Sequence, residues 1–411
     1  MPRSPSSPAF WRSPLRGPWF TSVLGVVLLA GITVLFVTGL LSYAAYNPDL
    51  SPVNDQTPDK GLLGFYLFSW PTHPSWLYRL TQGVHVTLGI ALIPVLLAKL
   101  WSVVPKLFAL PPARSLAHAL ERLSLLLLVG GGLFEFTTGV LNVQLDYIFP
   151  GSFYPLHFYG AWVFFAAFLA HAVLKTPLAL RNLRHIRDEQ PAGGGELVSP
   201  NPAEPTVSRR GALGVVGGGS LLLLATTAGR SFDGPLRETA VLAPHGGPEP
   251  GGGPGGFQIN KTAAYAGISP TETGEEAWRL VVTGRDGRSV RLDRPQLLQL
   301  ALHSSALPIA CVEGWSTSDQ WWRGVRLRDL AALVGHDDPV DVLVESLQRH
   351  GAFRRAALRA NQVADPRSLL ALFVNGEDLT PDHGYPARVI VPAAPGVLNT
   401  KWVARMTFGD L

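Results

Sequence analysis

Three histidines in the first half of the chain lie in apolar stretches and have spacings that suit axial ligands of haem. His157 and His171 are 14 residues apart, so an α-helix places them on one face, about 21 Å apart along its axis. His85 lies in an earlier apolar stretch, at a depth similar to that of His157. Two facing imidazoles form a six-coordinate electron-transfer site. His85 and His157 therefore predict one haem b near the outer surface, and hydrogen bonding between helices is the alternative.

A second haem at the inner level depends on what partners His171. Lys99 follows His85 by 14 residues and so lies at the matching depth, but an ammonium group must lose its proton to bind iron. Lys99 is also long enough to extend its charge to the inner surface. His118 is a further candidate, with an interfacial histidine as the alternative. The sequence predicts one haem b and allows a second.

The chain has a single cysteine, Cys311, which limits its metal chemistry. One thiol excludes an intrachain disulfide, a four-thiolate iron–sulfur cluster, a CxxC-type zinc site and CxxCH haem attachment. Cys311 is therefore a small core residue, a nucleophile or a metal ligand. No Cys/His protease-like signature accompanies it, and a soft thiolate suits a redox metal.

The segment CVEGWS at 311–316, followed by W-x-G and a predicted short helix, resembles the cysteine loop of the sulfite-oxidase superfamily of molybdenum enzymes. The resemblance is to the methionine-sulfoxide-reductase branch in particular, and it covers most of residues 257–411. It implies an α+β domain in which the Cys311 thiolate binds molybdenum beside one molybdopterin.

Three further segments follow the order of that family, at 257–268, 383–392 and 396–402. The resemblance implies that the molybdopterin is contacted by Asn260, Ser346, His383, Arg388, Asn399, Thr400 and Lys401. Arginine and lysine suit its terminal phosphate, because they form charge-assisted hydrogen bonds with the oxygens. Glu313 is expected at the surface or in a salt bridge. Three tryptophans are expected to line a substrate funnel or to pack in the core, namely Trp315, Trp321 and Trp322.

Four apolar stretches precede this domain, and each reaches the length of about 20 residues that a helix needs to cross a bilayer. They are 19–45, 79–104, 117–143 and 154–179. Basic residues flank their inner ends, which predicts that both ends of this unit face the cytoplasm. Residues 17–185 resemble the membrane cytochrome b subunits that pass quinol electrons to periplasmic oxidoreductases. Lys99 departs from the four-histidine, two-haem pattern of that family.

The sequence predicts five segments. A transmembrane four-helix cytochrome b-like domain (1–187) is followed by a cytoplasmic linker (188–207), an apolar segment with two leading arginines (208–229), a Gly/Pro-rich linker (230–256) and the molybdopterin domain (257–411). The apolar segment resembles a twin-arginine export signal, here expected to be retained as an anchor. The alternative is an ordinary fifth span, and both interpretations place the last domain outside.

Composition and local patterns agree with this division. Hydrophobic residues make up 47% of the 411 residues and charged residues 16%, which excludes a disordered protein and disfavours a purely soluble one. The net charge of +4 is explained by the basic flanks of the spans, so no nucleic-acid partner is implied. In the last domain, alternating patterns predict strands at 278–284, 341–346 and 387–393 and short helices near 294–302 and 326–334.

Together these inferences predict a multi-pass protein of the cytoplasmic membrane with its catalytic domain on the extracytoplasmic side. Quinol would donate electrons to haem, and the molybdenum centre would transfer an oxygen atom, reducing a sulfoxide or a similar oxo-substrate. The first alternative is the reverse direction, in which sulfite or another substrate is oxidised and quinone is reduced. The second is a non-catalytic, membrane-anchored binding protein with a degenerate molybdopterin domain. The third is an enzyme whose spans serve only as an anchor.

Overall fold

The computed structural model describes residues 4–51, 53–108, 115–143, 149, 152–184, 199, 201–232, 235–243 and 253–411. Parts of three predicted connections lie outside these residues, in the 144–153 loop and in the linkers 188–207 and 230–256. The chain divides into a helical unit (1–37, 87–141 and 156–225) and a β-rich unit (38–86, 142–155 and 226–411). The β-rich unit therefore includes residues that lie between the predicted spans.

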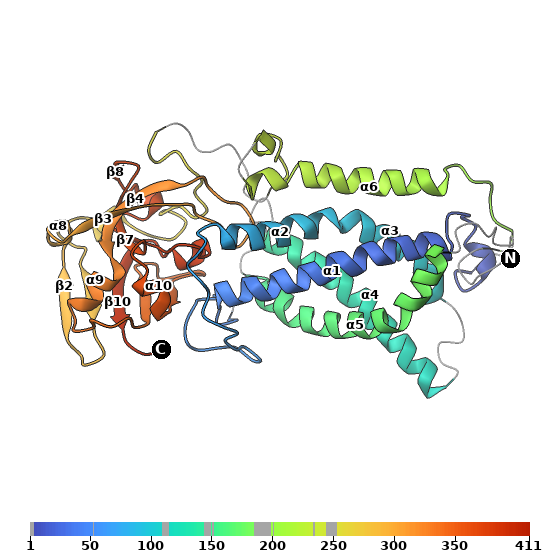
Figure 1. Ribbon diagram of the computed structural model, residues 1–411, viewed down its shortest axis with the longest axis horizontal. Helices are drawn as coiled ribbons and strands as arrows, with labels where there is room; N and C mark the ends of the chain where they lie inside the picture. The colour runs from blue at the N-terminus through green and yellow to red at the C-terminus, as the bar shows by residue number, and fades with distance from the viewer. Residues whose placement is uncertain are drawn as a thin grey trace. The chain divides into compact units, whose positions relative to one another are not determined.

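Four helices among the described residues are long and apolar enough to cross a bilayer. They are α1 (Pro18–Tyr46), α4 (Leu116–Asn142), α5 (Tyr154–Arg184) and a segment, Arg209–Arg230, that begins with α6 (Arg209–Ala225). The first three coincide with the first, third and fourth predicted spans (Figure 1). The last coincides with the predicted signal or fifth span. A helix satisfies its backbone groups internally, as a bilayer core requires.

The second predicted span is bent. Two helices, α2 (Leu77–Ala91) and α3 (Ile93–Leu107), meet at 41°. Pro94 lies in the first turn of α3 and has no amide hydrogen with which to continue the ladder of α2. The pair is long and apolar enough for one broken span. The expectation of one continuous helix over 79–104 is therefore wrong at this proline.

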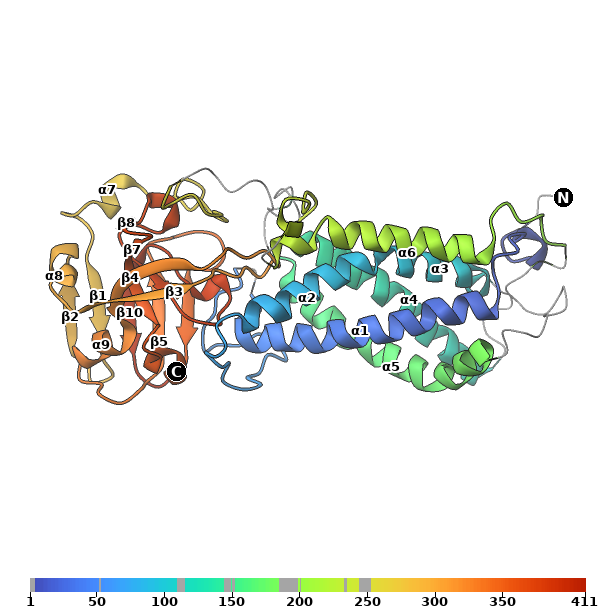
Figure 2. The same ribbon diagram turned by 45° about the horizontal axis from the view of Figure 1, so that its top comes forward.

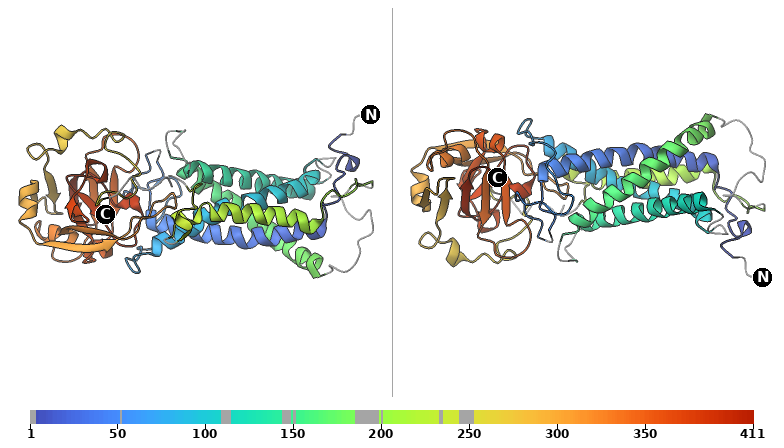
Figure 3. Two further views of the ribbon diagram at one scale, coloured as in Figure 1. Left: turned by 90° about the horizontal axis from the view of Figure 1, so that it is seen from above. Right: turned by 90° about the horizontal axis from the view of Figure 1, so that it is seen from below.

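The helical unit has an apolar centre and an apolar surface. Its centre is a stripe on α1 with i, i+4 spacing, formed by Phe20, Leu24, Leu28 and Ile32. Residues of α3, α5 and α6 pack on this stripe, and Figure 3 shows α1, α4 and α5 running alongside one another. Outward side chains are also apolar, since Leu126, Val173 and Leu221 are each more than 60% exposed. Helices that are apolar all round are typical of membrane spans.

The β-rich unit contains two sheets (Figure 2). One has the order β2-β1-β10-β5-β6, and the other has the order β3-β4-β7-β8 with β9 also paired to β7. The strands are β1 (Leu280–Thr283), β2 (Ser289–Leu292), β3 (Leu302–Leu307), β4 (Gln320–Arg326), β5 (Val342–Ser346), β6 (Arg355–Leu358), β7 (Leu369–Val374), β8 (Glu377–Asp378), β9 (Arg388–Ile390) and β10 (Val403–Phe408). The short helices are α7 (Pro270–Thr273), α8 (Arg294–Leu298), α9 (Leu327–Ala332) and α10 (Ala360–Ala364). The predicted strands (β1, β5 and β9) and short helices (α8 and α9) are confirmed, and the unit is α+β.

Strand β7 separates two cores. Leu370 and Leu372 face a core shared by both sheets, whereas Leu369 and Ala371 face a second core that contains Cys311. Successive residues of a strand point to opposite faces, and the unbroken apolar run of β7 is typical of a strand buried on both sides. The cysteine therefore packs against the face of the β3-β4-β7 sheet that lies opposite the shared core.

The segment between α1 and α2, predicted as an outer loop of the membrane domain, packs into the β-rich unit. Gln56 forms a parallel bridge with Ala356 of β6, the edge strand of the first sheet. Asp55 is fully buried and accepts hydrogen bonds from the Arg354 amide (2.7 Å), the Arg354 guanidinium (3.1 Å) and the Arg355 Nε (3.4 Å). An edge strand otherwise presents unpaired backbone groups. The segment thus covers part of this edge.

Replacement of Asp55 by alanine should destabilise the protein. The Arg354 amide and two guanidinium groups would lose their acceptor, a change that costs on the order of 3 kcal/mol. The measurement is the free energy of unfolding of the full chain in detergent, from a denaturant titration followed by circular dichroism. Asp59→Ala, at an exposed position of the same segment, is the control and should change stability by less than about 0.5 kcal/mol. Equal stability of the two variants would contradict this account.

Candidate functional site

Cys311 lies in a tight loop between β3 and β4. Its amide donates to the Trp315 carbonyl (2.8 Å), and the Gly314 amide donates to the Cys311 carbonyl (3.0 Å). Gly314 has a φ of +91°, a conformation that glycine adopts without steric cost. At the base of the loop, the Ile309 amide donates to Thr317 Oγ1 and the Thr317 amide donates to the Ile309 carbonyl, both at 2.9 Å. These bonds fix the cysteine backbone against the second core.

The Cys311 thiol is buried beside a carboxylate. Its Sγ lies 3.7 Å from Glu313 Oε2, which also accepts a hydrogen bond from Trp315 Nε1 (2.9 Å). Burial raises the pKa of the Cys311 thiol well above its ordinary value, and the negative charge of Glu313 acts in the same direction. A cysteine nucleophile needs a lowered pKa and a base, so this environment disfavours that role. Glu313 is 5% exposed, and the expected surface position is therefore wrong.

Two of the three nearby tryptophans belong to the core. Trp315 and Trp322 are buried in the cluster that contains Cys311, whereas Trp321 is 55% exposed. Of the two interpretations offered by the sequence, core packing therefore holds for Trp315 and Trp322.

Arg388 and Asn399 occupy neighbouring buried positions. The Arg388 guanidinium donates to the carbonyls of His383 (3.1 Å) and Asn399 (3.2 Å) and lies 5.1 Å from the centre of the Trp322 ring. Asn399 Oδ1 accepts a hydrogen bond from the Val391 amide (2.9 Å). Burial lowers the pKa of Arg388 to about 9, so the side chain stays charged at neutral pH. A buried cation of this kind suits an anionic ligand.

His383 is held in its neutral form. Its ring stacks on Phe257 at 3.8 Å, and its Nε2 lies 2.8 Å from the Gly255 carbonyl. Burial, together with the positive charges of Arg388 and Lys401, lowers the pKa of His383 to about 4. At pH 7 the ring is therefore neutral, and it donates from Nε2 to the carbonyl oxygen.

Lys401 is hydrogen-bonded to Ser346 and to the segment that contains Asn260. Its Nζ donates to the carbonyls of Lys261 (2.6 Å) and Asp382 (2.9 Å), and its own carbonyl accepts from Ser346 Oγ (2.8 Å). Asn260 precedes Lys261 and is half-buried. Burial lowers the pKa of Lys261 to about 8 and that of Lys401 well below its ordinary value. Lys261 is a second buried cation at this site that the sequence analysis did not single out.

Three buried polar atoms of this group have no hydrogen-bond partner within the described chain: Arg388 Nε, Asn399 Nδ2 and Thr400 Oγ1. Buried polar groups are nearly always hydrogen-bonded, and an unpaired one costs about 1–3 kcal/mol. The three atoms therefore fit a ligand rich in acceptors, as the phosphate and pterin of molybdopterin are.

The segment that carries Asn399 and Thr400 is also tied to the cysteine loop. The Gly396 amide donates to the Ala310 carbonyl (2.6 Å).

Within the β-rich unit, the cysteine loop also packs against α2. Gln82 Nε2 donates to the Val312 carbonyl, and a Cβ at Gly314 would lie 2.7 Å from the Val86 Cβ. Tyr78, one turn earlier, packs in the same apolar cluster as the residue that precedes the cysteine. Residues 78, 82 and 86 are four apart and share one face of α2. This face carries no motif of charged or metal-binding residues, so the sequence analysis did not identify it.

His85 and His157 have matching surroundings in their own units. His85 Nδ1 lies 3.0 Å from Thr38 Oγ1, and His157 Nδ1 lies 3.0 Å from Thr138 Oγ1. The residue after each threonine is a glycine that faces the imidazole Cε1. The Thr-Gly dipeptide, at 38–39 and again at 138–139, is the sequence signal for these contacts.

The contacts of Thr138 assign a tautomer to His157. The Thr138 hydroxyl donates to the Phe134 carbonyl (2.8 Å), so its oxygen accepts the hydrogen of His157 Nδ1. Glu135 Oε2 lies 3.2 Å from the same nitrogen. A proton on Nδ1 leaves the lone pair on Nε2, which is how metal-bound imidazoles are usually oriented.

The candidate ligands of the inner haem, Lys99, His171 and His118, have different surroundings. Lys99 Nζ donates to the Thr21 carbonyl of α1 (2.7 Å), which favours a structural role. His171 on α5 and His118 on α4 are half-buried. In the parts of the chain that the structure describes, no group of three or more His, Cys, Asp or Glu residues could hold a metal ion. Haem brings four nitrogen ligands of its own, so that finding does not bear on it.

Comparison with known proteins identifies the C-terminal part. Residues 266–410 match the family of the oxidoreductase molybdopterin binding domain. Mitochondrial sulfite oxidase of Mus musculus is 31% identical over 156 residues, which cover 32% of this chain and 29% of that protein. The catalytic subunit MsrP of the protein-methionine-sulfoxide reductase of Gluconobacter oxydans is 31% identical over 151 residues, 32% of this chain and 47% of that protein.

A third relative is the uncharacterized oxidoreductase YuiH of Bacillus subtilis. It is 30% identical over 131 residues, 32% of this chain and 65% of that protein. The chain thus spans less than two thirds of the length of each of these relatives. Residues 266–410 are a sulfite-oxidase-type molybdopterin oxidoreductase domain.

Proposed function

We propose that this protein is a membrane-bound molybdenum oxidoreductase that moves electrons between the quinone pool, haem b and a molybdopterin centre. Its reaction is oxygen-atom transfer, with a sulfoxide or a similar oxo-substrate as the acceptor. The spans lie in the cytoplasmic membrane, and the catalytic domain lies on the extracytoplasmic side. The segment that begins at Arg209 is retained as an anchor, so the domain stays with its electron donor.

The contact between the cysteine loop and α2 is the observation that carries this proposal. Gln82 and Val86 hold the loop, and His85 lies between them on the same helix. A domain that used the spans only as an anchor would not need its cysteine loop to pack against a histidine-bearing helix. The packing therefore favours electron exchange over simple anchoring.

The residues around Cys311 have distinct roles in holding the cofactor. When bound, molybdopterin supplies a dithiolene-held molybdenum that exchanges an oxygen atom with the substrate. The Cys311 thiol would lose its proton and bind the metal. Arg388 and Lys401 would bind the phosphate, and Asn399 and Thr400 would donate to it or to the pterin. The remaining contacts would come from Asn260, Ser346 and His383.

Haem b would be held by two histidines. The sequence predicts that His85 and His157 lie at a similar depth in the membrane. A threonine at Nδ1 of each would orient the ring so that Nε2 is presented to iron. His171 would serve a second, inner haem. The hydrogen bond between Lys99 and α1 disfavours lysine as its partner, which leaves His118 as the candidate.

The reverse direction is a second candidate function. The relatives include both a sulfite oxidase and a methionine-sulfoxide reductase, so the match to the molybdopterin binding domain does not fix the direction of the reaction. In membranes, consumption of a sulfoxide driven by added quinol would support reduction. Oxidation of sulfite that depends on added quinone would support the reverse. A non-catalytic binding protein is disfavoured, because Cys311 and the buried donors are all present.

Replacement of Thr400 by valine should affect the loaded and unloaded protein differently. In protein made without molybdopterin, the hydroxyl has no partner within the described chain, so the free energy of unfolding should change by less than about 0.5 kcal/mol. In cells that make the cofactor, molybdenum per polypeptide should fall about tenfold after extended dialysis, the effect of losing about 1.4 kcal/mol. Elemental analysis measures this content, and an unchanged value would contradict the assigned contact.

Thr317→Val is the matched control for this experiment. The Thr317 hydroxyl accepts the Ile309 amide, so its loss should destabilise the protein by about 1–3 kcal/mol, with or without the cofactor.

Replacement of Cys311 by serine should abolish turnover and leave the haem intact. A hydroxyl is a much poorer ligand than a thiolate for a soft redox metal. The measurements are sulfoxide reduction with an artificial donor and the reduced-minus-oxidised haem spectrum of the same sample. Activity equal to that of the unaltered protein would exclude Cys311 as the metal ligand.

Replacement of His85 or His157 by alanine should remove the outer haem and lower the haem content of the purified protein. Loss of one axial ligand leaves the iron without its second imidazole. Haem is measured as the pyridine haemochrome, alongside iron by elemental analysis. His73→Ala is the control, because this side chain is 74% exposed and should leave the spectrum unchanged. A normal spectrum in either of the first two variants would refute that ligand.

A further inference from the structure

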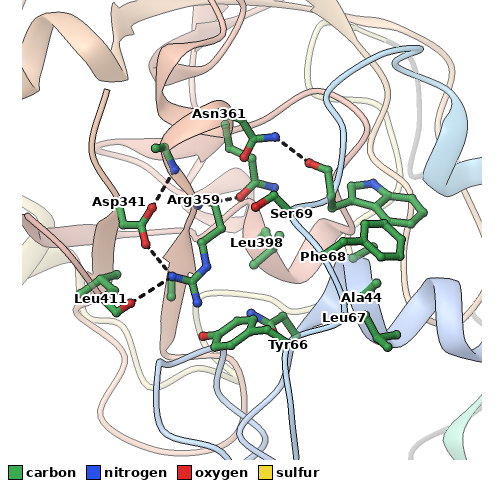
Figure 4. Close-up of a pocket in the computed structure, with 16 residues that line it drawn as sticks. Ala44, Tyr66, Leu67, Phe68, Ser69, Asp341, Arg359, Asn361, Leu398 and Leu411 are labelled. Carbon is green, nitrogen blue, oxygen red and sulfur yellow. Dashed lines mark hydrogen bonds and ion pairs between the residues drawn. The ribbon is translucent and has the colours of Figure 1, made fainter. Parts of the chain in front are cut away.

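A cavity of about 640 Å³ lies in the β-rich unit, and none of its lining residues is among the proposed cofactor contacts. Its wall has three parts (Figure 4). One is the end of α1, with Ala44 and Ala45, and the second is residues 66–70 of the segment that follows α1. The third comes from the α+β domain and includes Asp341 and residues 359–362. The volume is in the range of sites for small organic ligands.

One end of the cavity is polar and fixed in position. The Arg359 guanidinium lies 4.0 Å from the centre of the Tyr66 ring and donates to Asp341 Oδ2 and to the Leu411 carbonyl. Asn361 Nδ2 donates to the Trp70 carbonyl (2.8 Å). The cation and the amide are therefore oriented before any ligand binds, next to aromatic rings.

The other side of the cavity is apolar and belongs to the segment that follows a candidate span. This segment starts directly after α1, a candidate span that ends at Tyr46. Leu67 and Phe68 line the cavity, and near them Leu62 and Leu63 are 79% and 68% exposed. Exposed leucine and aromatic side chains next to the end of a span are typical of the membrane interface. The apolar side thus adjoins the end of a candidate span.

We propose that this cavity binds the head group of a quinone that enters from the outer leaflet. Arg359 and Asn361 offer donors for the ring oxygens, and Phe68, which is 48% exposed, offers an aromatic wall for a planar ring. The isoprenoid tail would leave past Leu67 towards the lipid. A water-soluble substrate would not require the exposed leucines. The proposal rests on the proposed function for the redox role of the quinone, but the binding site is argued from the cavity alone.

The test is equilibrium binding of a benzoquinone with one isoprenoid unit to the full-length holoprotein in phosphatidylcholine nanodiscs. Leu67→Trp fills the cavity, and Leu62→Trp adds the same bulk to the same segment outside it. We expect Leu67→Trp to raise the Kd about tenfold or more, and Leu62→Trp to change it less than about twofold. Molybdenum and haem contents show that both variants are folded and loaded.

A photoreactive azidoquinone gives a second measurement that needs no variant. Cross-links should map to peptides that contain residues 66–70 or 357–362. If Leu67→Trp does not fold, Phe68→Ala replaces it, because this side chain is 48% exposed and its truncation removes only a wall of the cavity. Cross-links found only elsewhere, equal Kd values for the two tryptophan variants, or no binding to the unaltered protein would each overturn the assignment.

Reduction of the haem by the matching quinol, followed in the same samples, separates this proposal from the proposed function. Rapid reduction that Leu67→Trp leaves unchanged, with cross-links elsewhere, would refute the cavity and support the electron function. Binding in the cavity without any haem reduction would support the cavity and refute the electron function.

Discussion

The packing of the cysteine loop on α2 is the constraint on which the other features depend. Gln82 reaches the Val312 carbonyl, and Val86 occupies the space that a side chain at Gly314 would fill. The same loop is tied at its other end to Gly396, and so to the segment with the unpaired donors. One loop thus contacts both α2, the candidate haem helix, and the segment that carries the candidate cofactor residues.

The candidate cofactor site contains features that cost free energy when it is empty. The unpaired atoms of Arg388, Asn399 and Thr400 are buried, and two lysines and an arginine lie close together with lowered pKa values. Both features oppose folding of the empty domain. A ligand with a phosphate and many acceptors would relieve both at once, so binding and stability are coupled. The empty domain is therefore expected to be less stable than the loaded one, as is typical of a protein that holds its cofactor tightly.

Much of the β-rich unit could be predicted from the sequence, because the evidence for it is local. The motif around Cys311 and the alternation in β1, β5 and β9 each occupy a few adjacent residues. The bend at Pro94 also had a local signal, which the long apolar run concealed. The burial of Asp55 had none, since its partner Arg354 lies 299 residues away. Glu313 was misplaced for a similar reason, because a carboxylate beside a core cysteine contradicts average burial preferences.

The bridge between Gln56 and β6 has a consequence for the order in which the protein is completed. Residues 53–57 are synthesised early and emerge as a connection between two candidate spans, whereas the strand that they join is made about 300 residues later. Pairings over such separations close last, because a very long loop must first be ordered. A segment made early is therefore available to pair with a nearly finished sheet, as in strand addition between separate chains. In this way the sheet becomes complete only when its late-made strand meets a segment made near the start of the chain.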